Sequence, residues 1–176
     1  MLSDRSMNLS IKEKGEMILK SLLEAGDARL KEMMVISDKI KETSENLKAA
    51  AAENDLRENQ AYINNLENLQ FLYAKQSQYK DWMDAYEGFK KGLTPDGKIP
   101  ALESDSIDIG STVTVENDGV YTTILLVPKK LGRSTIGAVA ENTPLGKELL
   151  GRRKGDKVAV KTPGALILDY NITEVN

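Results

Sequence analysis

The apolar residues in the first half of the chain follow the spacing of a coiled coil. One series alternates steps of three and four residues, and its members are Met33, Ile36, Ile40, Thr43, Leu47, Ala50 and Asn54. After a break, a second series contains Tyr62, Leu66, Leu69, Tyr73, Gln76, Lys80 and Met83. This alternation places one face of a helix against a partner helix. The pattern therefore predicts two long helices, of roughly 45 and 37 residues.

Capping signals indicate where these helices begin. Ser10 and Glu13 have the spacing of a capping box, and so do Asp55 and Glu58 after the break. Asn54 tolerates the left-handed conformation that ends a helix. We therefore predict an antiparallel hairpin with its tip at about residues 54–58. A continuous helix through Asn54, forming a parallel dimer, is the competing interpretation.

The pattern changes near Gly92, after which all five prolines of the chain occur. Short β-branched runs predict strands at residues 111–115, 120–127, 136–139, 157–161, 165–170 and 172–175. Thr143 and Pro144 are typical of the first residues of a helix. We expect a small, mostly antiparallel sheet packed by one helix, and an α+β protein. The predicted organisation is a hairpin over 1–92, a linker over 93–109 and a C-terminal domain over 110–176.

The composition narrows the chemistry that the chain can perform. Its 176 residues carry a net charge of −3 and include neither cysteine nor histidine. This excludes disulfides, thiolate metal sites and Ser/His triads, and leaves oxygen ligands for any metal, which suit Mg²⁺, Mn²⁺ or Ca²⁺. Without a basic stripe, the chain is not expected to hold free nucleic acid by itself. No apolar run has the length of a signal-peptide core or a membrane span, so we expect a cytoplasmic protein.

Asp55 and Glu58 are the candidate chemical groups. They lie three residues apart at a predicted helix start, so both side chains project from one face. Two carboxylates so placed can complete an Mg²⁺ site whose other ligands come from another molecule. The same spacing is also that of an ordinary capping box, which needs no metal.

Two islands of sequence resemble the Gre family of transcript-cleavage and elongation factors. The first, residues 55–62, reads Asp-Leu-Arg-Glu-Asn-Gln-Ala-Tyr and is similar to the tip of the Gre hairpin. The second comprises residues 142–151, 154–156 and 162–164, and is similar to the signature of the Gre C-terminal domain. The resemblance implies an antiparallel coiled-coil hairpin followed by a domain of FKBP-like topology, without prolyl isomerase activity.

The resemblance also implies a function. It indicates a monomeric elongation factor that binds the secondary channel of bacterial RNA polymerase and stimulates cleavage of the backtracked RNA 3′ end, without being an enzyme itself or carrying a cofactor. Asp55 and Glu58 are implied to help hold a second Mg²⁺ at the polymerase active site. Asn59 and Tyr62 are expected to support the tip. The implied contacts with the channel rim are Asn142 and Pro144.

Departures from the family pattern leave alternatives open. Asn54 stands where the family has glycine, Ala140 stands where it usually has a polar residue, and residues 129–133 have no counterpart that we can place. A channel-binding regulator that does not promote cleavage is therefore an alternative function. A structural coiled-coil dimer with a C-terminal interaction module is another. Lys48, Arg57 and Lys75 are further candidates for contact with RNA.

Overall fold

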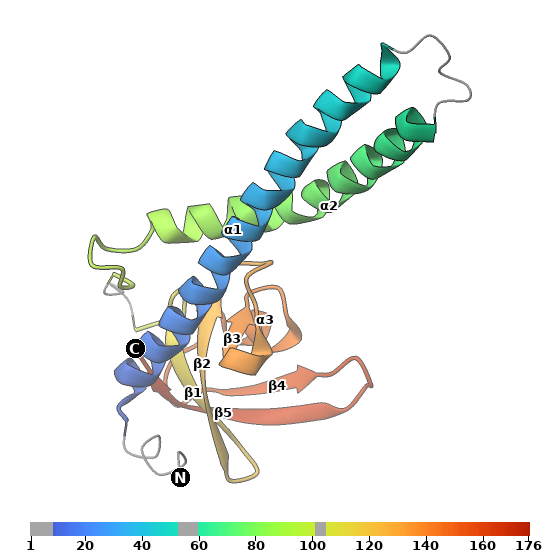
Figure 1. The fold of residues 1–176 in the computed structure, drawn as a ribbon. Helices are drawn as coiled ribbons and strands as arrows, with labels where there is room; N and C mark the ends of the chain where they lie inside the picture. The colour runs from blue at the N-terminus through green and yellow to red at the C-terminus, as the bar shows by residue number, and fades with distance from the viewer. Residues whose placement is uncertain (1–8, 53–59, 101–104) are drawn as a thin grey trace, which may run out of the picture. The chain divides into compact units, whose positions relative to one another are not determined.

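The structure is a computed structural model that describes residues 9–52, 60–100 and 105–176. The chain forms two compact units (Figure 1). One unit combines Met1–Glu24 with Ala85–Asn176, and the other is Ala25–Asp84. Both long helices therefore contribute residues to both units.

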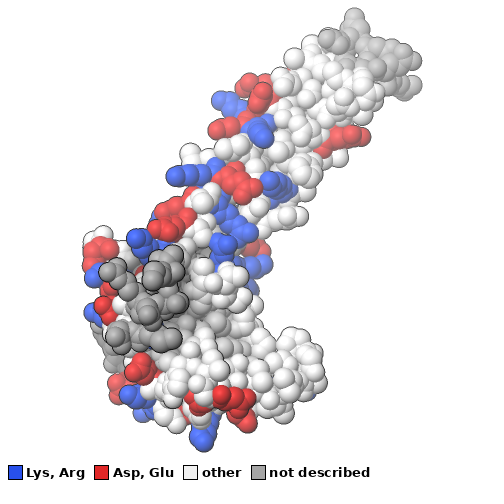
Figure 2. Space-filling model, turned by 60° about the horizontal axis from the view of Figure 1, so that its bottom comes forward, with Lys and Arg blue, Asp and Glu red and all other residues white. Residues whose placement is uncertain are grey.

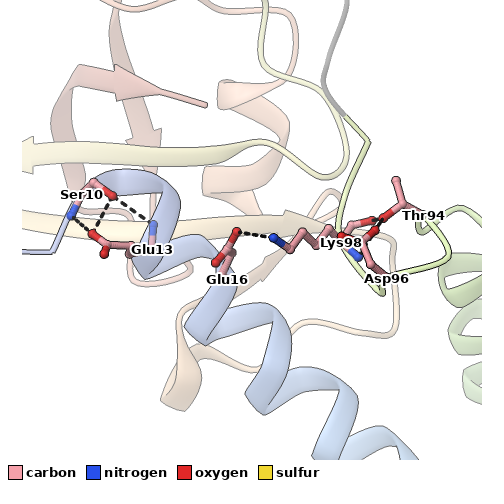
Figure 3. A network of polar contacts seen from close by, with 6 residues as sticks. All are labelled: Ser10, Glu13, Glu16, Thr94, Asp96 and Lys98. Atoms are coloured by element: carbon pink, nitrogen blue, oxygen red, sulfur yellow. Dashed lines mark hydrogen bonds and ion pairs between the residues drawn. The ribbon is translucent and has the colours of Figure 1, made fainter.

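The first helix, α1, spans Ile11–Ala51 and begins at the predicted capping box. The Ser10 backbone N–H donates to Glu13 Oε2 at 2.8 Å, and the Glu13 N–H donates to Ser10 Oγ at 3.3 Å (Figure 3). The hydrogen bond from the Ser10 hydroxyl to the Glu13 carboxylate lowers the pKa of Glu13. This reciprocal pairing satisfies backbone donors that a helix start leaves open, so the predicted start signal is confirmed.

The second helix, α2, spans Gln60–Lys91 and packs against α1 within the hairpin unit. The packed residues are Met33, Ile36, Ile40, Leu69, Leu72, Tyr79 and Met83, all members of the predicted seams except Leu72 and Tyr79. Beside them, Lys75 Nζ lies 3.1 Å from Glu32 Oε1. Arg29 of α1 contacts Tyr79 and Trp82 of α2, whereas Ser37, further along α1, contacts Gln76, which comes earlier in α2. The antiparallel hairpin is confirmed, and the interpretation as one continuous helix is wrong.

Aromatic side chains near the ends of the seam take part in packing. The Arg29 guanidinium lies 5.1 Å from the ring centre of Tyr79 and 4.9 Å from that of Trp82. Such cation–π contacts hold an arginine against its partner helix. In the other unit, Tyr86 is fully buried and its hydroxyl donates to the Leu23 carbonyl at 2.9 Å.

The C-terminal part forms one sheet with strand order β3-β2-β1-β5-β4. Its elements are β1 Thr112–Asn117, β2 Val120–Val127, a 3₁₀ turn at Ser134–Ile136, β3 Ala138–Ala140, α3 Pro144–Leu149, β4 Lys157–Lys161 and β5 Ile167–Val175. All neighbouring strands are antiparallel except β2 and β3, which are parallel. The predicted α+β class and the mostly antiparallel sheet are confirmed.

Two predicted strands prove to be one. We expected an interruption near Asn171, but β5 runs through this residue. Asn171 lies in register with Glu116 on β1 and Lys157 on β4, and its side-chain amide donates to the Glu116 carboxylate. A polar residue that finds a cross-strand partner does not end a strand. The predicted third strand, in turn, begins only at Ala138, because Gly137 has φ of 80° and closes the preceding turn.

The sheet is covered on both faces. On one face, α3 and the strands bury a core that contains Ile107, Val113, Val115, Ile124, Leu126, Leu149, Val158, Val160 and Ile172. Because side chains alternate along a strand, Thr112 and Thr114 face the other side. The start of α1 packs there so closely that a Cβ at Gly15 would overlap Thr112 Oγ1. Glycine is therefore the residue that permits this close approach of helix to sheet.

An ion pair joins the start of α1 to the connection that follows α2. Lys98 Nζ lies 3.6 Å from Glu16 Oε1, and the turn that carries Lys98 is closed by Thr94, whose hydroxyl bonds to Asp96 (Figure 3). Both side chains of the ion pair are largely exposed, so the pair contributes little to stability. Along the described residues, no helix combines the length and apolar character needed to cross a membrane.

Substitution of Gly15 tests the close contact between α1 and β1. Gly15→Ala is expected to lower the free energy of unfolding by about 1–3 kcal/mol, because the added methyl group clashes with Thr112. Gly88→Ala is the matched control, since Gly88 lies in α2 and a methyl group added there would have no neighbour within 4 Å. It should raise stability by about 0.5–1 kcal/mol through helix propensity. Urea unfolding measures both, and stabilisation by Gly15→Ala would contradict the contact.

The Glu116 carboxylate predicts a pH dependence of stability. It accepts hydrogen bonds from the Asn171 amide and from the Gly119 N–H, and these lower its pKa below the ordinary 4.5. A lowered folded-state pKa stabilises the fold above about pH 4.5, and this contribution disappears as the pH falls through the folded-state value. Glu116→Gln should therefore destabilise the protein at neutral pH but not in acid. Urea unfolding of both proteins across this range measures the difference, and a pH-independent difference would contradict it.

Candidate functional site

The predicted site residues belong to two places, the end of the hairpin and the loop before α3. At the hairpin end, α1 finishes at Ala51 and α2 begins at Gln60. Asp55, Glu58 and Asn59 lie outside the described residues, so their functions stay predictions. Tyr62 is described, lies in the first turn of α2, and has a partly buried side chain.

The first turn of α2 has its own polar support. The Gln60 side-chain amide donates to Asn64 Oδ1 at 2.8 Å, which links positions i and i+4 of the helix. Among residues 9–52, 60–100 and 105–176, no three acidic side chains come together as metal ligands.

The hairpin carries nearly balanced charge. Residues 25–52 and 60–84 include seven basic and eight acidic side chains. Figure 2 shows the two kinds interspersed along the helices on the face in view. Of the proposed RNA contacts, Lys75 is already paired with Glu32. The described part of the hairpin therefore lacks the basic surface by which proteins hold a phosphate backbone.

The loop before α3 is built around Thr143. Its backbone is extended, and its hydroxyl accepts a hydrogen bond from the Gly146 N–H at 3.0 Å. The same hydroxyl donates to the Ala140 carbonyl at 2.7 Å. Pro144 follows as the first residue of α3, as predicted. One side chain thus fixes both the end of β3 and the start of α3.

Close packing holds the same loop rigid. A Cβ at Gly146 would overlap the Ala140 carbonyl oxygen, and one at Gly132 would lie 2.9 Å from the Ala140 Cβ. The Ala140 methyl group is accommodated because both neighbours are glycines. Asn142 and Pro144 lie on this closely packed loop, and their side chains are exposed. The structure therefore presents both predicted contact residues to solvent from one short, well-supported loop.

An open groove of about 490 Å³ adjoins the loop. Its apolar wall comes from β3, α3, β4 and β5, and includes Val139, Leu145, Val160, Leu168 and Tyr170. Pro144 lies on its margin, together with Pro163 from the β4–β5 turn. Sequence patterns did not reveal this groove, because its walls come from four separate elements.

Residues 129–133 had no function that sequence patterns could assign. In the structure, the Lys129 N–H donates to Glu141 Oε1 at 3.0 Å, and Leu131 is 1% exposed. Arg133 exchanges backbone hydrogen bonds with Ala138 at 2.7 and 3.1 Å. The segment therefore packs beside the loop that carries Asn142 and Pro144. Pro128 and Gly132 signal turns here, but no sequence pattern connects them to the loop.

Comparison with known proteins gives consistent matches. The family model described as "Transcription elongation factor, GreA/GreB, C-term" matches residues 102–176. The transcription elongation factor GreA of Nitratiruptor sp. is 28% identical over 150 residues, covering 82% of this chain and 85% of the relative. GreA of Bacillus licheniformis is 29% identical over 151 residues, covering 84% and 90%. The crystal structure of Thermus aquaticus Gfh1 is 18% identical and covers 87% of this chain and 95% of that one, with a TM-score of 0.37.

The Thr143 hydroxyl provides a test of the loop. Thr143→Val keeps the shape of the side chain but removes both hydrogen bonds, and should cost about 1 kcal/mol of unfolding free energy. Hydrogen exchange at the Gly146 amide should become faster, because this donor loses its acceptor. Thr143→Ser keeps the hydroxyl and serves as control. Equal exchange rates in the Val and Ser variants would contradict the assigned contact.

Proposed function

We propose that this chain is a Gre-family transcription elongation factor that stimulates cleavage of backtracked RNA from within the secondary channel of a bacterial RNA polymerase. The match of residues 102–176 to the GreA/GreB C-terminal domain supports this, and so does the alignment of the chain along most of the length of GreA relatives. The observation that carries the proposal is the antiparallel hairpin, whose helices are joined by a short interval containing Asp55 and Glu58. It would act as a monomer in the cytoplasm, where transcription takes place.

The two helices supply the reach that this function needs. At about 1.5 Å per residue, α1 is about 62 Å long and α2 about 48 Å. An apolar seam within the chain holds them together. The part of the two helices that forms the hairpin unit, Ala25–Asp84, would enter a channel in a much larger enzyme. Its balanced charge would let it enter without being held by RNA along its length.

The chemistry would depend on Asp55 and Glu58. Carboxylate oxygens are the ligands that Mg²⁺ prefers, and two of them fill only part of its octahedral shell. In two-metal phosphoryl chemistry, a second Mg²⁺ activates the attacking water. Asp55 and Glu58 would hold one side of this ion, and the polymerase and the RNA would provide the remaining ligands. Asn59 and Tyr62 would keep the two acids in position at the start of α2.

The loop before α3 would set the depth of insertion. Asn142 and Pro144 are exposed on a loop fixed by Thr143, so they can meet a partner surface without first becoming ordered. We assign them to contact with the rim of the channel. Docking at the rim and delivery of the acids would then be performed by different parts of the chain.

The tip acids are tested in a backtracked elongation complex. Asp55→Asn and Glu58→Gln keep side-chain size but remove the charge that holds Mg²⁺, so the stimulated cleavage rate should fall at least about tenfold. Glu67→Gln is the control, because Glu67 is an exposed acid of α2 outside the tip. The measurement is the rate of RNA cleavage with and without factor in Mg²⁺.

Other results of the cleavage assay would contradict parts of the proposed function. Stimulation that survives loss of both tip charges would overturn the assignment of Asp55 and Glu58. Slower elongation without added cleavage by the unmodified factor would favour the alternative, a channel-binding regulator. Solution mass of the free protein checks the monomer, since a dimer would favour a structural coiled coil.

A further inference from the structure

The loop before α3, which carries Asn142 and Pro144 and which we call the docking loop, borders a groove that is apolar but has positive charge on one side. None of the residues that line it is Asp or Glu, and Lys130 is the one lining residue that is charged at neutral pH. Lys129 and Arg133 are exposed next to it. The chain as a whole carries a net charge of −3, so the positive charge at this edge of the groove is opposite in sign to the net charge of the protein. We call residues 129–133 the basic segment.

The basic segment is anchored to the docking loop. Leu131 is buried, and Gly132 lies directly against Ala140. The Lys129 N–H bonds to the carboxylate of Glu141, the residue before Asn142. Because the basic segment makes these contacts through its backbone and the Leu131 side chain, the charged ends of Lys129 and Arg133 are not needed to hold it in place.

Lys130 has a backbone conformation that lysine seldom adopts. Its φ is 83°, and the turn is closed by a hydrogen bond from the Leu131 N–H to the Pro128 carbonyl at 3.1 Å. This position of a turn normally takes glycine or asparagine. A lysine at this position therefore carries a backbone cost that glycine would not have, and it places a long cationic side chain at the groove.

We propose that the basic segment makes this groove selective for an acidic protein surface, namely an apolar segment flanked by carboxylates on the polymerase. This inference rests on the proposed function and adds which partner surface the C-terminal domain selects. Apolar side chains of Val139, Leu145 and Leu168 would receive the apolar segment. Lys129, Lys130 and Arg133 would attract its carboxylates. A nucleic acid fits less well, because the wall offers Tyr170 as its one aromatic ring for stacking.

Charge reversal tests the attraction. Lys129→Glu combined with Arg133→Glu should weaken binding to core polymerase about tenfold at low salt, and the difference should narrow at high salt because rim charges are screened. Lys20→Glu combined with Lys154→Glu is the matched control, since both are exposed lysines of the same compact unit that do not line the groove. Equal affinity of the two double variants would overturn the inference.

A second variant separates binding from folding. Lys130→Gly removes the side chain and relieves the backbone, so it should weaken binding while leaving the unfolding midpoint unchanged or higher. If Lys130 had only a structural role, its removal would not weaken binding while leaving the unfolding midpoint unchanged or higher. Asp118→Gly is the control, because Asp118 also has positive φ, of 49°, but lies in the β1–β2 turn away from the groove lining. Unchanged affinity of Lys130→Gly would count against the inference.

The binding assay also distinguishes this inference from the proposed function. If the unmodified factor does not bind polymerase, the proposed function and the selectivity of the basic segment are both overturned. If it binds and stimulates cleavage while the charge-reversed form binds equally well, the selectivity of the basic segment alone is wrong. If the unmodified factor binds single-stranded RNA by itself and the charge-reversed form does not, the segment is an RNA contact and the inference is overturned.

Discussion

The compact unit that contains the sheet depends on how closely the start of α1 approaches β1. At Gly15 the side chain of Thr112 occupies the space where a Cβ would stand. This contact brings Leu19 and Leu22 into the interior and covers the sheet face opposite α3. Leu125 and Val127 of β2 are fully buried in the same unit. A helix that extends into the hairpin therefore also completes the core of the domain.

Features decided within a few residues were predictable from the sequence. The capping box at Ser10, the Thr143-Pro144 helix start and the β1–β2 hairpin each depend on near neighbours in the chain. The seam of the hairpin was predictable for a related reason, since a repeat over many residues averages out single exceptions such as Thr43, which is buried within it. These local and periodic signals were sufficient for most of the fold.

Features that depend on distant partners were not predictable in the same way. Asn171 interrupts an apolar pattern, yet it continues a strand because Glu116, 55 residues away, accepts its amide. Leu131 stands alone among basic residues and shows no period, so nothing in the sequence marks it as buried. The groove is assembled from β3, α3, β4 and β5, and its existence follows from topology rather than from any motif. The candidate site was thus predicted as two sets of residues but not as a surface.

The single tryptophan gives the hairpin a spectroscopic signature of its own. Trp82 lies in the hairpin unit, with the Arg29 guanidinium over its ring, and the unit that contains the sheet has no tryptophan. Its fluorescence therefore reports the loosening of the coiled coil, whereas the backbone amide NMR signals of the strands follow the sheet. Because α1 and α2 contribute to both units, coincident melting curves would mean that the chain unfolds as one cooperative body. Separate curves would mean that the hairpin unit can unfold while the unit that contains the sheet stays folded.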